Sequence, residues 1–330
     1  MPNYGNDKTE AILKKIEEEI RLEFERAYAD LERKAKKYFM GFNAEDVVLK
    51  DKVANGLMPE ADYQDWRRRH IVMGQHWEDM KLNMAKELHH VNEKALRIAK
   101  DKMPDVFVLN ANYAAFEIER GYGIDTGFVL FNRDAAEWLL GGPDKLLPAP
   151  GIHKALELWE NPDVRWNAKN IQSAILQGIL QGEPMWKVAK RLMNVTDMDY
   201  KAAVRNARTM TTAAQNAGRE AAYHRIDPEG DKLTIIWLST LDNRTRHSHR
   251  MMHGEVKDGE YFSNGLRYPG DPEGDPSEVY NCRCQERAFI KGMEEVVTYS
   301  PKMGEQSFEE WLNGKVMTKE QEQRFLRGES

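Results

Sequence analysis

The chain has 330 residues, of which 41% are hydrophobic and 31% are charged, and its formal net charge is −6. A chain of this length and composition can bury a core and has room for two or three domains. A mean hydropathy of −0.71 argues against membrane insertion, and a pI near 5.9 excludes a global basic field for gripping DNA. The first residues carry no secretory signal pattern, so we expect the protein in the cytoplasm.

The first part of the chain is predicted to be helical. Residues 9–39 carry apolar side chains every three or four positions and contain no proline or glycine, which predicts one long amphipathic helix. Its apolar stripe needs a partner, either elsewhere in the chain or in another subunit. Shorter helices are expected over residues 43–52 and 59–70, a second long helix over 75–102, and a helical, aromatic segment beginning at Pro104.

The middle of the chain alternates breaks and helices. We expect a break at residues 121–125, and the Pro- and Gly-rich residues 141–150 predict a loop or a domain junction. Two helices are predicted next, over residues 166–182 and 185–193.

A further helix is expected to be rich in alanine, which allows close packing against neighbours. It would begin at a cap on Asp197 or Asp199, run to about residue 224, and end firmly at residues 227–230.

After that break the pattern changes to strands. Residues 233–238 are β-branched and aromatic, as in a core strand, and further strands are expected at Val256, 261–262 and 282–290. Capping-box patterns predict tail helices over residues 307–312 and 318–326. The fold class is therefore α+β, with a predominantly helical N-terminal two-thirds followed by a small C-terminal α+β domain with a short antiparallel sheet. The expected domains are residues 1–145, 150–295 and a helical tail, 296–330.

Residues 237–287 hold both cysteines and three of the nine histidines. Cysteines two positions apart are poorly placed for a mutual disulfide, but in a strand both sulfurs would lie on one face. A tetrahedral zinc site is one interpretation, although structural zinc sites usually leave two to four residues between cysteines. The other is that the cysteines are small buried apolar residues in a loop held by hydrogen bonds. The donors considered for zinc are Cys282, Cys284, His247 or His249, and Asp242 or His253.

The same stretch contains the most basic patch of an acidic protein. Asp242 follows a strand directly, where its side chain can cap a turn. The arginines around it could contact DNA or another acidic group, or they could form an ion-pair network within the chain. The candidates for an external contact are Arg244, Arg246, Arg250 and Arg283, with His247, His249 and Arg267 nearby.

This stretch resembles the C-terminal signature of the phage Mu F-like family, the head-morphogenesis or minor head proteins of tailed bacteriophages. The residues that carry the resemblance are Trp237, Asp242, Arg244, Arg246, His249, Gly254, Asn281, Cys282 and Cys284, with Pro269-Gly270-Asp271-Pro272 between them. The preceding helical segments 178–184, 207–209 and 217–219 are similar to the way that family leads into its signature. One departure is His253, where an acidic or variable residue is expected, so no role is carried onto it.

The resemblance implies a minor capsid protein of low copy number inside the virion head. Such a protein would associate with the portal in the procapsid during assembly in the host cytoplasm, with no membrane involved. The scaffold, the major capsid protein and packaged DNA are further partners that it implies. It links the chain to head morphogenesis, DNA packaging or ejection, and it points to the long N-terminal helices as the portal contact.

Two enzymatic readings compete with a head protein. A metal-dependent hydrolase or nuclease would act on phage DNA through Asp242, His249, Cys282 and Cys284. These residue types are present, but not in a recognised catalytic arrangement, and the chain has no P-loop, no Gly-x-Ser-x-Gly and no dinucleotide fingerprint. The other hypothesis is a transferase domain fused after the signature, but the residues that follow the signature are too few for a catalytic domain. We therefore expect no enzyme and no certain cofactor, with zinc as the one candidate.

Overall fold

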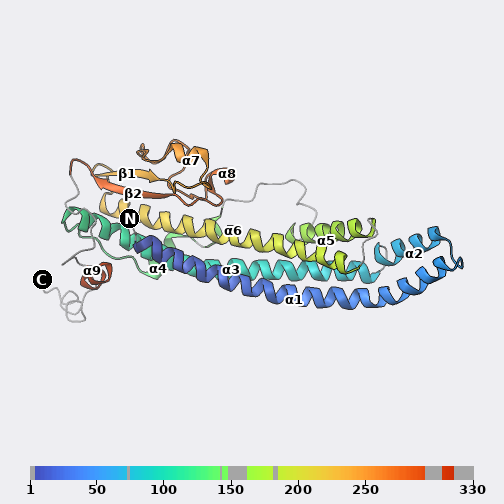
Figure 1. The fold of residues 1–330 in the computed structure, drawn as a ribbon. Helices are drawn as coiled ribbons and strands as arrows, with labels where there is room; N and C mark the ends of the chain where they lie inside the picture. Colours follow the sequence, from blue (N-terminus) through green and yellow to red (C-terminus); the bar gives the residue numbers. More distant parts are fainter. Residues whose placement is uncertain are drawn as a thin grey trace. The chain divides into compact units, whose positions relative to one another are not determined.

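The computed structural model describes residues 4–72, 75–141, 143–147, 162–180, 185–293 and 307–315. It confirms the α+β fold class, with long helices followed by a small two-stranded sheet (Figure 1). None of the helices in these ranges combines the length and the apolar character that a membrane span requires. The elements are α1 Tyr4–Ala54, α2 Glu60–Val72, α3 Gln75–Tyr122, α4 Arg133–Leu139, η1 Pro143–Leu146, α5 Pro162–Leu180, α6 Met185–Ile226, β1 Leu233–Leu238, α7 His247–Met251, α8 Pro276–Val279, β2 Gln285–Ile290 and α9 Phe308–Lys315.

The three longest helices run through breaks that the sequence predicts. α1 joins the expected helices 9–39 and 43–52, and α3 continues through Pro104. Proline removes one intrahelical hydrogen bond, but its neighbours Met103 and Val106 are fully buried, so packing on both sides keeps the helix continuous. α6 likewise joins 185–193 to the alanine-rich helix, and Asp197 pairs with Lys201 one turn later instead of capping a new helix.

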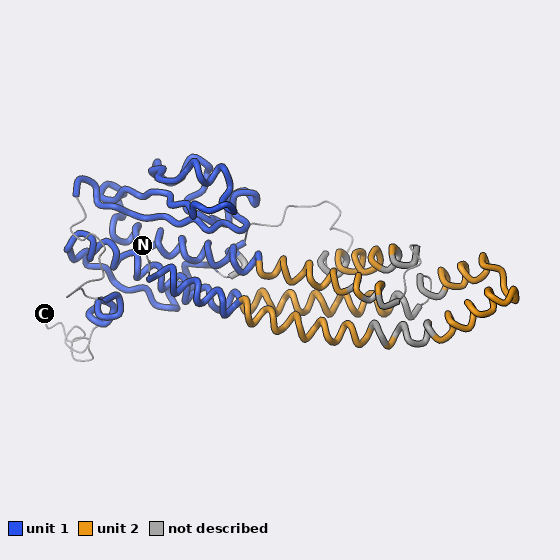
Figure 2. Tube along the Cα trace, viewed as in Figure 1, with its two compact units in different colours: residues 1–16, 99–150, 205–330 blue, residues 17–98, 151–204 orange. Residues whose placement is uncertain are grey.

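The described chain separates into two compact units (Figure 2). Unit 1 contains residues 1–16, 99–150 and 205–330, and unit 2 contains residues 17–98 and 151–204. Each unit draws on segments from distant parts of the sequence, because α1, α3 and α6 each contribute to both. The domain limits expected from the sequence remain a prediction.

In unit 2 the apolar stripe of α1 finds its partner within the chain. Ile20 and Leu31 of α1 are fully buried, as is Leu88 of α3. An ion pair of 2.7 Å between Glu23 and Lys94 links the same two helices. Of the two partners that the sequence left open for this stripe, the chain's own helix is the one observed.

In unit 1 a glycine lets α3 and α6 approach closely. A Cβ atom on Gly218 would lie 2.5 Å from the carbonyl oxygen of Phe107, closer than any ordinary carbon–oxygen contact. The buried residues around this crossing include Ala111, Ala114 and Ala214. Small side chains on α6 thus serve the close packing that the alanine-rich pattern predicts.

The residues between α6 and β1 form a tight junction organised by Asp227. Its carboxylate accepts hydrogen bonds from the backbone N–H groups of Gly230, Asp231, Lys232 and Leu233, at 2.8–3.2 Å. These bonds hold the pKa of Asp227 below its usual value, although partial burial of the carboxyl opposes them. The predicted end of the helix at residues 227–230 is confirmed.

β1 and β2 pair antiparallel, with Leu233 opposite Ile290 and Leu238 opposite Gln285. Short bridges at Val256 and Tyr261 confirm the extended segments expected there. The prediction of a strand through residues 282–290 is correct only from Gln285 onward. Asn281 adopts a positive φ of 58°, and Cys282 to Cys284 form no strand, because their backbone is held by side chains of α6 instead of by β1.

Two short helices complete the comparison with the sequence. α4 was not predicted, although Asn132 is its N-cap and accepts a hydrogen bond from the N–H of Ala135 at 2.8 Å. α9 confirms the helix expected at residues 307–312, where Ser307 and Glu310 form the predicted capping box. The helix expected at 318–326 lies outside the described residues, as does the predicted helix stop at 182–184.

Replacing Gly218 by alanine should destabilise unit 1. Overpacking costs about 1–3 kcal/mol and alanine returns about 0.5–1 kcal/mol of helix propensity, so the net loss should be at most about 2.5 kcal/mol. Urea unfolding followed by circular dichroism measures it. Lys201→Ala, at an exposed position of the same helix, is the control and should change stability little. Equal or greater stability of Gly218→Ala would show that the helices do not cross so closely.

Candidate metal centre

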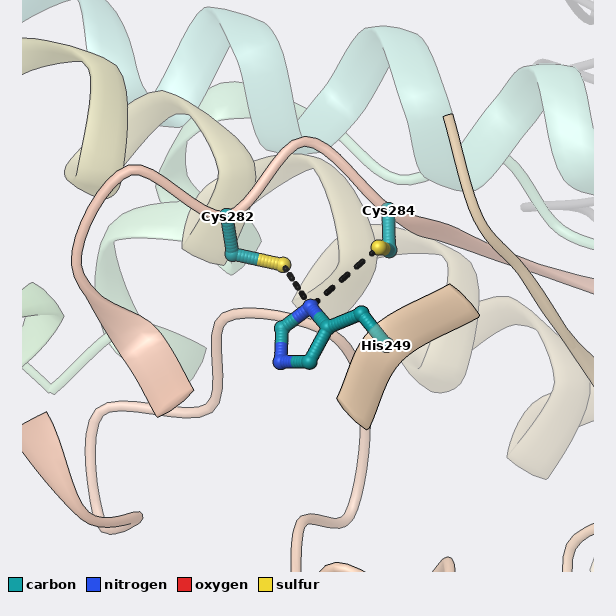
Figure 3. Close-up of side chains that lie close together, drawn as sticks. All are labelled: His249, Cys282 and Cys284. Carbon is teal, nitrogen blue, oxygen red and sulfur yellow. Dashed lines mark hydrogen bonds between the residues drawn. The ribbon is translucent and has the colours of Figure 1, made fainter. Parts of the chain in front are cut away.

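Three buried side chains converge at one point of unit 1: His249, Cys282 and Cys284 (Figure 3). The Nδ1 atom of His249 lies 3.6 Å from the Cys282 sulfur and 3.4 Å from the Cys284 sulfur. The three donor atoms all lie within 4.8 Å of one another, and each residue is at most 2% exposed. Of the zinc donors considered from the sequence, the structure therefore brings together these three.

The other nitrogen of the imidazole has its own partner. His249 Nε2 lies 2.8 Å from a carboxylate oxygen of Glu278 in α8. Trp237 of β1 packs its ring edge-on against the imidazole, with the ring centres 5.2 Å apart. The carboxylate and the indole together fix the plane of the His249 ring.

Local backbone geometry places His249 on the first turn of a short helix. Arg246 precedes α7, and its guanidinium donates to the carbonyl groups of Glu278 and Tyr280. The Ser239 hydroxyl donates to the carbonyl of His249. Gly254, with a φ of 84°, turns the chain so that its N–H donates to the Trp237 carbonyl at 2.8 Å.

A polar stripe on α6 holds the cysteine segment from the other side. The Thr212 hydroxyl donates to the carbonyl of Cys282 at 2.7 Å, and the Thr209 hydroxyl accepts from the N–H of Asn281 at 3.1 Å. These residues and Asn216 follow one another at i, i+3 and i+7, so they lie on one face of the helix.

Asn216 makes the largest contribution to this stripe. Its side chain is fully buried, and its Nδ2 donates to the carbonyl groups of Thr212, Pro269 and Cys284 at 2.9–3.1 Å. Its Oδ1 accepts from the N–H of Glu286 at 3.2 Å. The amide of Asn216 thus hydrogen-bonds the loop at Pro269, the cysteine segment and the start of β2 to α6.

Sequence analysis missed the three residues Thr209, Thr212 and Asn216. The available signal was three polar side chains at helical spacing, in a stretch that also contains Arg208, Thr211 and Gln215. Buried polar groups need partners, so such a stripe indicates that backbone from elsewhere in the fold docks there.

Asp242 lies apart from the three converging side chains. Its carboxylate forms a bidentate pair with Arg283, at 2.6 and 2.7 Å, and accepts from the N–H of Arg244 and the hydroxyl of Thr245. The hydrogen bonds from Arg283 are the main reason that the pKa of Asp242 is held well below its usual value. The turn-capping role predicted for Asp242 is therefore what the structure shows.

Most of the basic patch is likewise engaged within the chain. Arg250 donates to the Asp242 carbonyl at 2.8 Å, and Arg267 makes a bidentate pair with the buried carboxylate of Asp271 at 2.7 and 2.8 Å. Arg244 is exposed. The intramolecular network that the sequence offered as one alternative thus accounts for Arg246, Arg250, Arg267 and Arg283.

The remaining two histidines of this stretch lie outside the cluster. His247 is exposed at the start of α7. His253 is exposed as well, and its Nδ1 accepts a hydrogen bond from the Ser239 N–H at 3.2 Å. Substitutions at these two exposed histidines can therefore serve as controls for substitutions of the buried His249.

The two thiols are inequivalent. A hydrogen bond from the Cys282 thiol, together with His249, lowers the pKa of Cys284 to about 4, whereas the same bond and full burial raise the pKa of Cys282.

A second buried group of charges lies beside the sheet. Glu286 of β2 is fully buried, and burial together with the nearby carboxylate of Glu220 raises its pKa well above the usual value. Lys257 and Arg219 act in the opposite direction, and Lys257 forms an ion pair with Glu220 at 2.5 Å. Glu286 is therefore held in the neutral form.

These observations define an α+β protein in which a small sheet and its loops are fastened to one long helix. Residues 169–287 match the family described as Phage Mu protein F like protein. That range contains the three converging side chains and their anchors on α6. The resemblance predicted from the sequence is confirmed, because this part of the chain is similar to the Mu F-like family.

Two relatives with specific names are similar to the chain. Minor head protein GP7 of Bacillus phage SPP1 is 26% identical over 236 residues, which are 70% of this chain and 71% of that protein. The NAD(+)--arginine ADP-ribosyltransferase EFV of Enterococcus faecalis is 25% identical over 254 residues, which are 72% of this chain and 51% of that protein. The chain therefore spans about half the length of the second relative.

A third relative is an uncharacterized protein of Haemophilus influenzae. It is 26% identical over 136 residues, which are 41% of this chain and 28% of that protein. No solved structure matches the chain.

Replacing Asn216 by leucine should strongly destabilise unit 1. The change keeps the volume nearly constant but leaves the carbonyl groups of Pro269 and Cys284 and the N–H of Glu286 without partners. Each unsatisfied buried group costs about 1–3 kcal/mol, so we expect a loss of about 3 kcal/mol or more in unfolding free energy. Thermal and urea unfolding measure it, with the exposed Asn243→Leu as control. A loss below that of a surface substitution would contradict the anchoring role.

Glu286→Gln should become increasingly stabilising, relative to the natural chain, as the pH rises. The pKa of Glu286 is raised in the folded state. Folding is therefore most stable below the pKa of the unfolded chain, about 4.3, where the carboxyl is neutral in both states. Stability then falls as the pH rises from that value toward the folded pKa. Urea unfolding at pH 5 and pH 8 compares the two proteins. Glu260→Gln, at an exposed position, should leave the pH dependence unchanged. A difference that is constant or that shrinks with pH would show that Glu286 is ionised in the fold.

Proposed function

We propose that the protein is a minor head protein of a tailed bacteriophage, which associates with the portal inside the procapsid and aids head morphogenesis, DNA packaging or ejection. The similarity to minor head protein GP7 of phage SPP1 supports this most directly, because it extends over 70% of the chain. The aligned length exceeds the Mu F-like range 169–287, so the likeness includes helical residues outside it. The scaffold, the major capsid protein and packaged DNA are the further partners in this proposal.

We place the portal contact on exposed apolar residues of unit 2. The apolar stripe of α1 is buried between residues 16 and 31 and is not available to another protein. Near the C-terminal end of α1, by contrast, Val47, Val48 and Leu57 are 59%, 52% and 76% exposed. Exposed apolar side chains of this kind can anchor a contact between proteins.

The nuclease alternative has less support from the geometry. His249, Cys282 and Cys284 are buried, which leaves no path for a phosphodiester to reach them, and Asp242 is paired with Arg283. A metal-dependent nuclease needs a metal with an open position that the substrate can reach. The transferase activity in the name of the Enterococcus relative belongs to a protein of which this chain spans about half.

The proposal predicts that the protein is present in purified procapsids of the phage that encodes it and is recovered with tagged portal. Mass spectrometry of the particles and co-purification with the portal measure the two outcomes. Absence of the protein from procapsids would overturn the proposal.

A pair of variants locates the contact. Leu57→Asp together with Val48→Asp should lower recovery with portal roughly tenfold or more, because apolar anchors at an interface contribute about 1–2 kcal/mol each. Val129→Asp, at a position of unit 1 that is 70% exposed, is the matched control and should bind normally. If both variants bind equally well, the contact lies elsewhere on the protein.

A further inference from the structure

The contacts of His249 cannot all be satisfied by hydrogen bonds. Cys282 and Cys284 both approach the same ring nitrogen, Nδ1, at 3.6 and 3.4 Å (Figure 3). A neutral imidazole nitrogen has either one N–H or one lone pair in the ring plane, so it makes one such bond. Only one of the two sulfurs can therefore bond to His249 through a proton, and the other sulfur then bonds to the neighbouring cysteine.

A metal ion satisfies both sulfurs at once. Zinc binds sulfur at about 2.3 Å and imidazole nitrogen at about 2.0 Å, and tetrahedral angles then separate the two donor atoms by about 3.5 Å. The observed separations of 3.4 and 3.6 Å bracket that value. Both separations between the imidazole nitrogen and the sulfurs thus fit a tetrahedral ion, and all three donor atoms lie within 4.8 Å of one another.

The tautomer of His249 also fits a metal ligand. With the ring proton on Nε2, this nitrogen donates to the carboxylate of Glu278 at 2.8 Å, and the lone pair of Nδ1 then faces the sulfurs as it would in a metal ligand. A carboxylate behind a histidine in this way orients the ring and strengthens it as a ligand. The N–H of Thr240 in addition donates to the Cys284 sulfur, a contact that supports a thiolate.

We propose that His249, Cys282 and Cys284 bind one zinc ion, with Glu278 as the residue that positions the imidazole. The ion would link α7 to the segment before β2 and thereby close the loops between the two strands. Because the three ligands are buried, its role is structural. The proposal is independent of the head-protein function, since it rests only on the geometry within unit 1.

Metal analysis of the full chain, purified without chelator and in the presence of a reductant, tests this site. We expect about one zinc ion per chain by mass spectrometry of the elements, and its loss in His249→Ala and in Cys284→Ser. His247→Ala, two residues away at an exposed position of the same helix, should retain the metal. Glu278→Gln should retain the ligands but weaken zinc binding about 10–100-fold.

A second test uses the natural protein, so it does not depend on whether the ligand variants fold. After removal of metal with a chelator, added Zn²⁺ should raise the melting temperature and protect both thiols from a thiol-reactive dye. Mg²⁺, which prefers oxygen ligands, should do neither. A protein without zinc whose melting temperature and thiol reactivity ignore added Zn²⁺ would overturn the proposal, as would full zinc content in His249→Ala.

Discussion

The C-terminal part of unit 1 depends on one amide side chain that serves four backbone groups. Asn216 is buried in α6 and binds the carbonyl groups of Thr212, Pro269 and Cys284 and the N–H of Glu286. A two-stranded sheet is marginal by itself, because it has too little apolar surface to bury. Fastening its loops and its second strand to a long helix supplies the surface and the hydrogen bonds that the sheet lacks.

That attachment in turn places the converging donors. Thr209 and Thr212 fix the backbone of residues 281 and 282, and Asn216 fixes that of residue 284. Both cysteine side chains then point away from α6 toward the imidazole, which Glu278 and Trp237 orient from their own side. The pocket for His249 thus depends on residues of α6, α8 and β1, and Trp237 belongs to the same buried apolar cluster as both cysteines.

The sequence predicted those features that depend on local patterns. β1 was found from its β-branched run and the end of α6 from residues 227–230, whereas the sequence left open whether His247 or His249 meets the cysteines. The misses have a common physical origin in tertiary contacts. Pro104 and Asp197 carry local break signals that burial of neighbouring residues overrides, and the segment 282–284 leaves the strand because α6 captures its backbone. A prediction from one sequence cannot see which helix supplies those partners.

The hydrogen bonds between α6 and the cysteine segment also set an order for folding. They join residues 68 to 72 positions apart, and closing so long a loop costs entropy before any contact is gained. α6 is made first during synthesis. The polar side chains of its stripe have no backbone partners until residues 281–286 have been synthesised. We therefore expect the sheet to protect its amides late in refolding, after α6, and pulsed hydrogen exchange that found the reverse order would refute this sequence of events. The stripe acts as a template on which the last part of the unit is assembled.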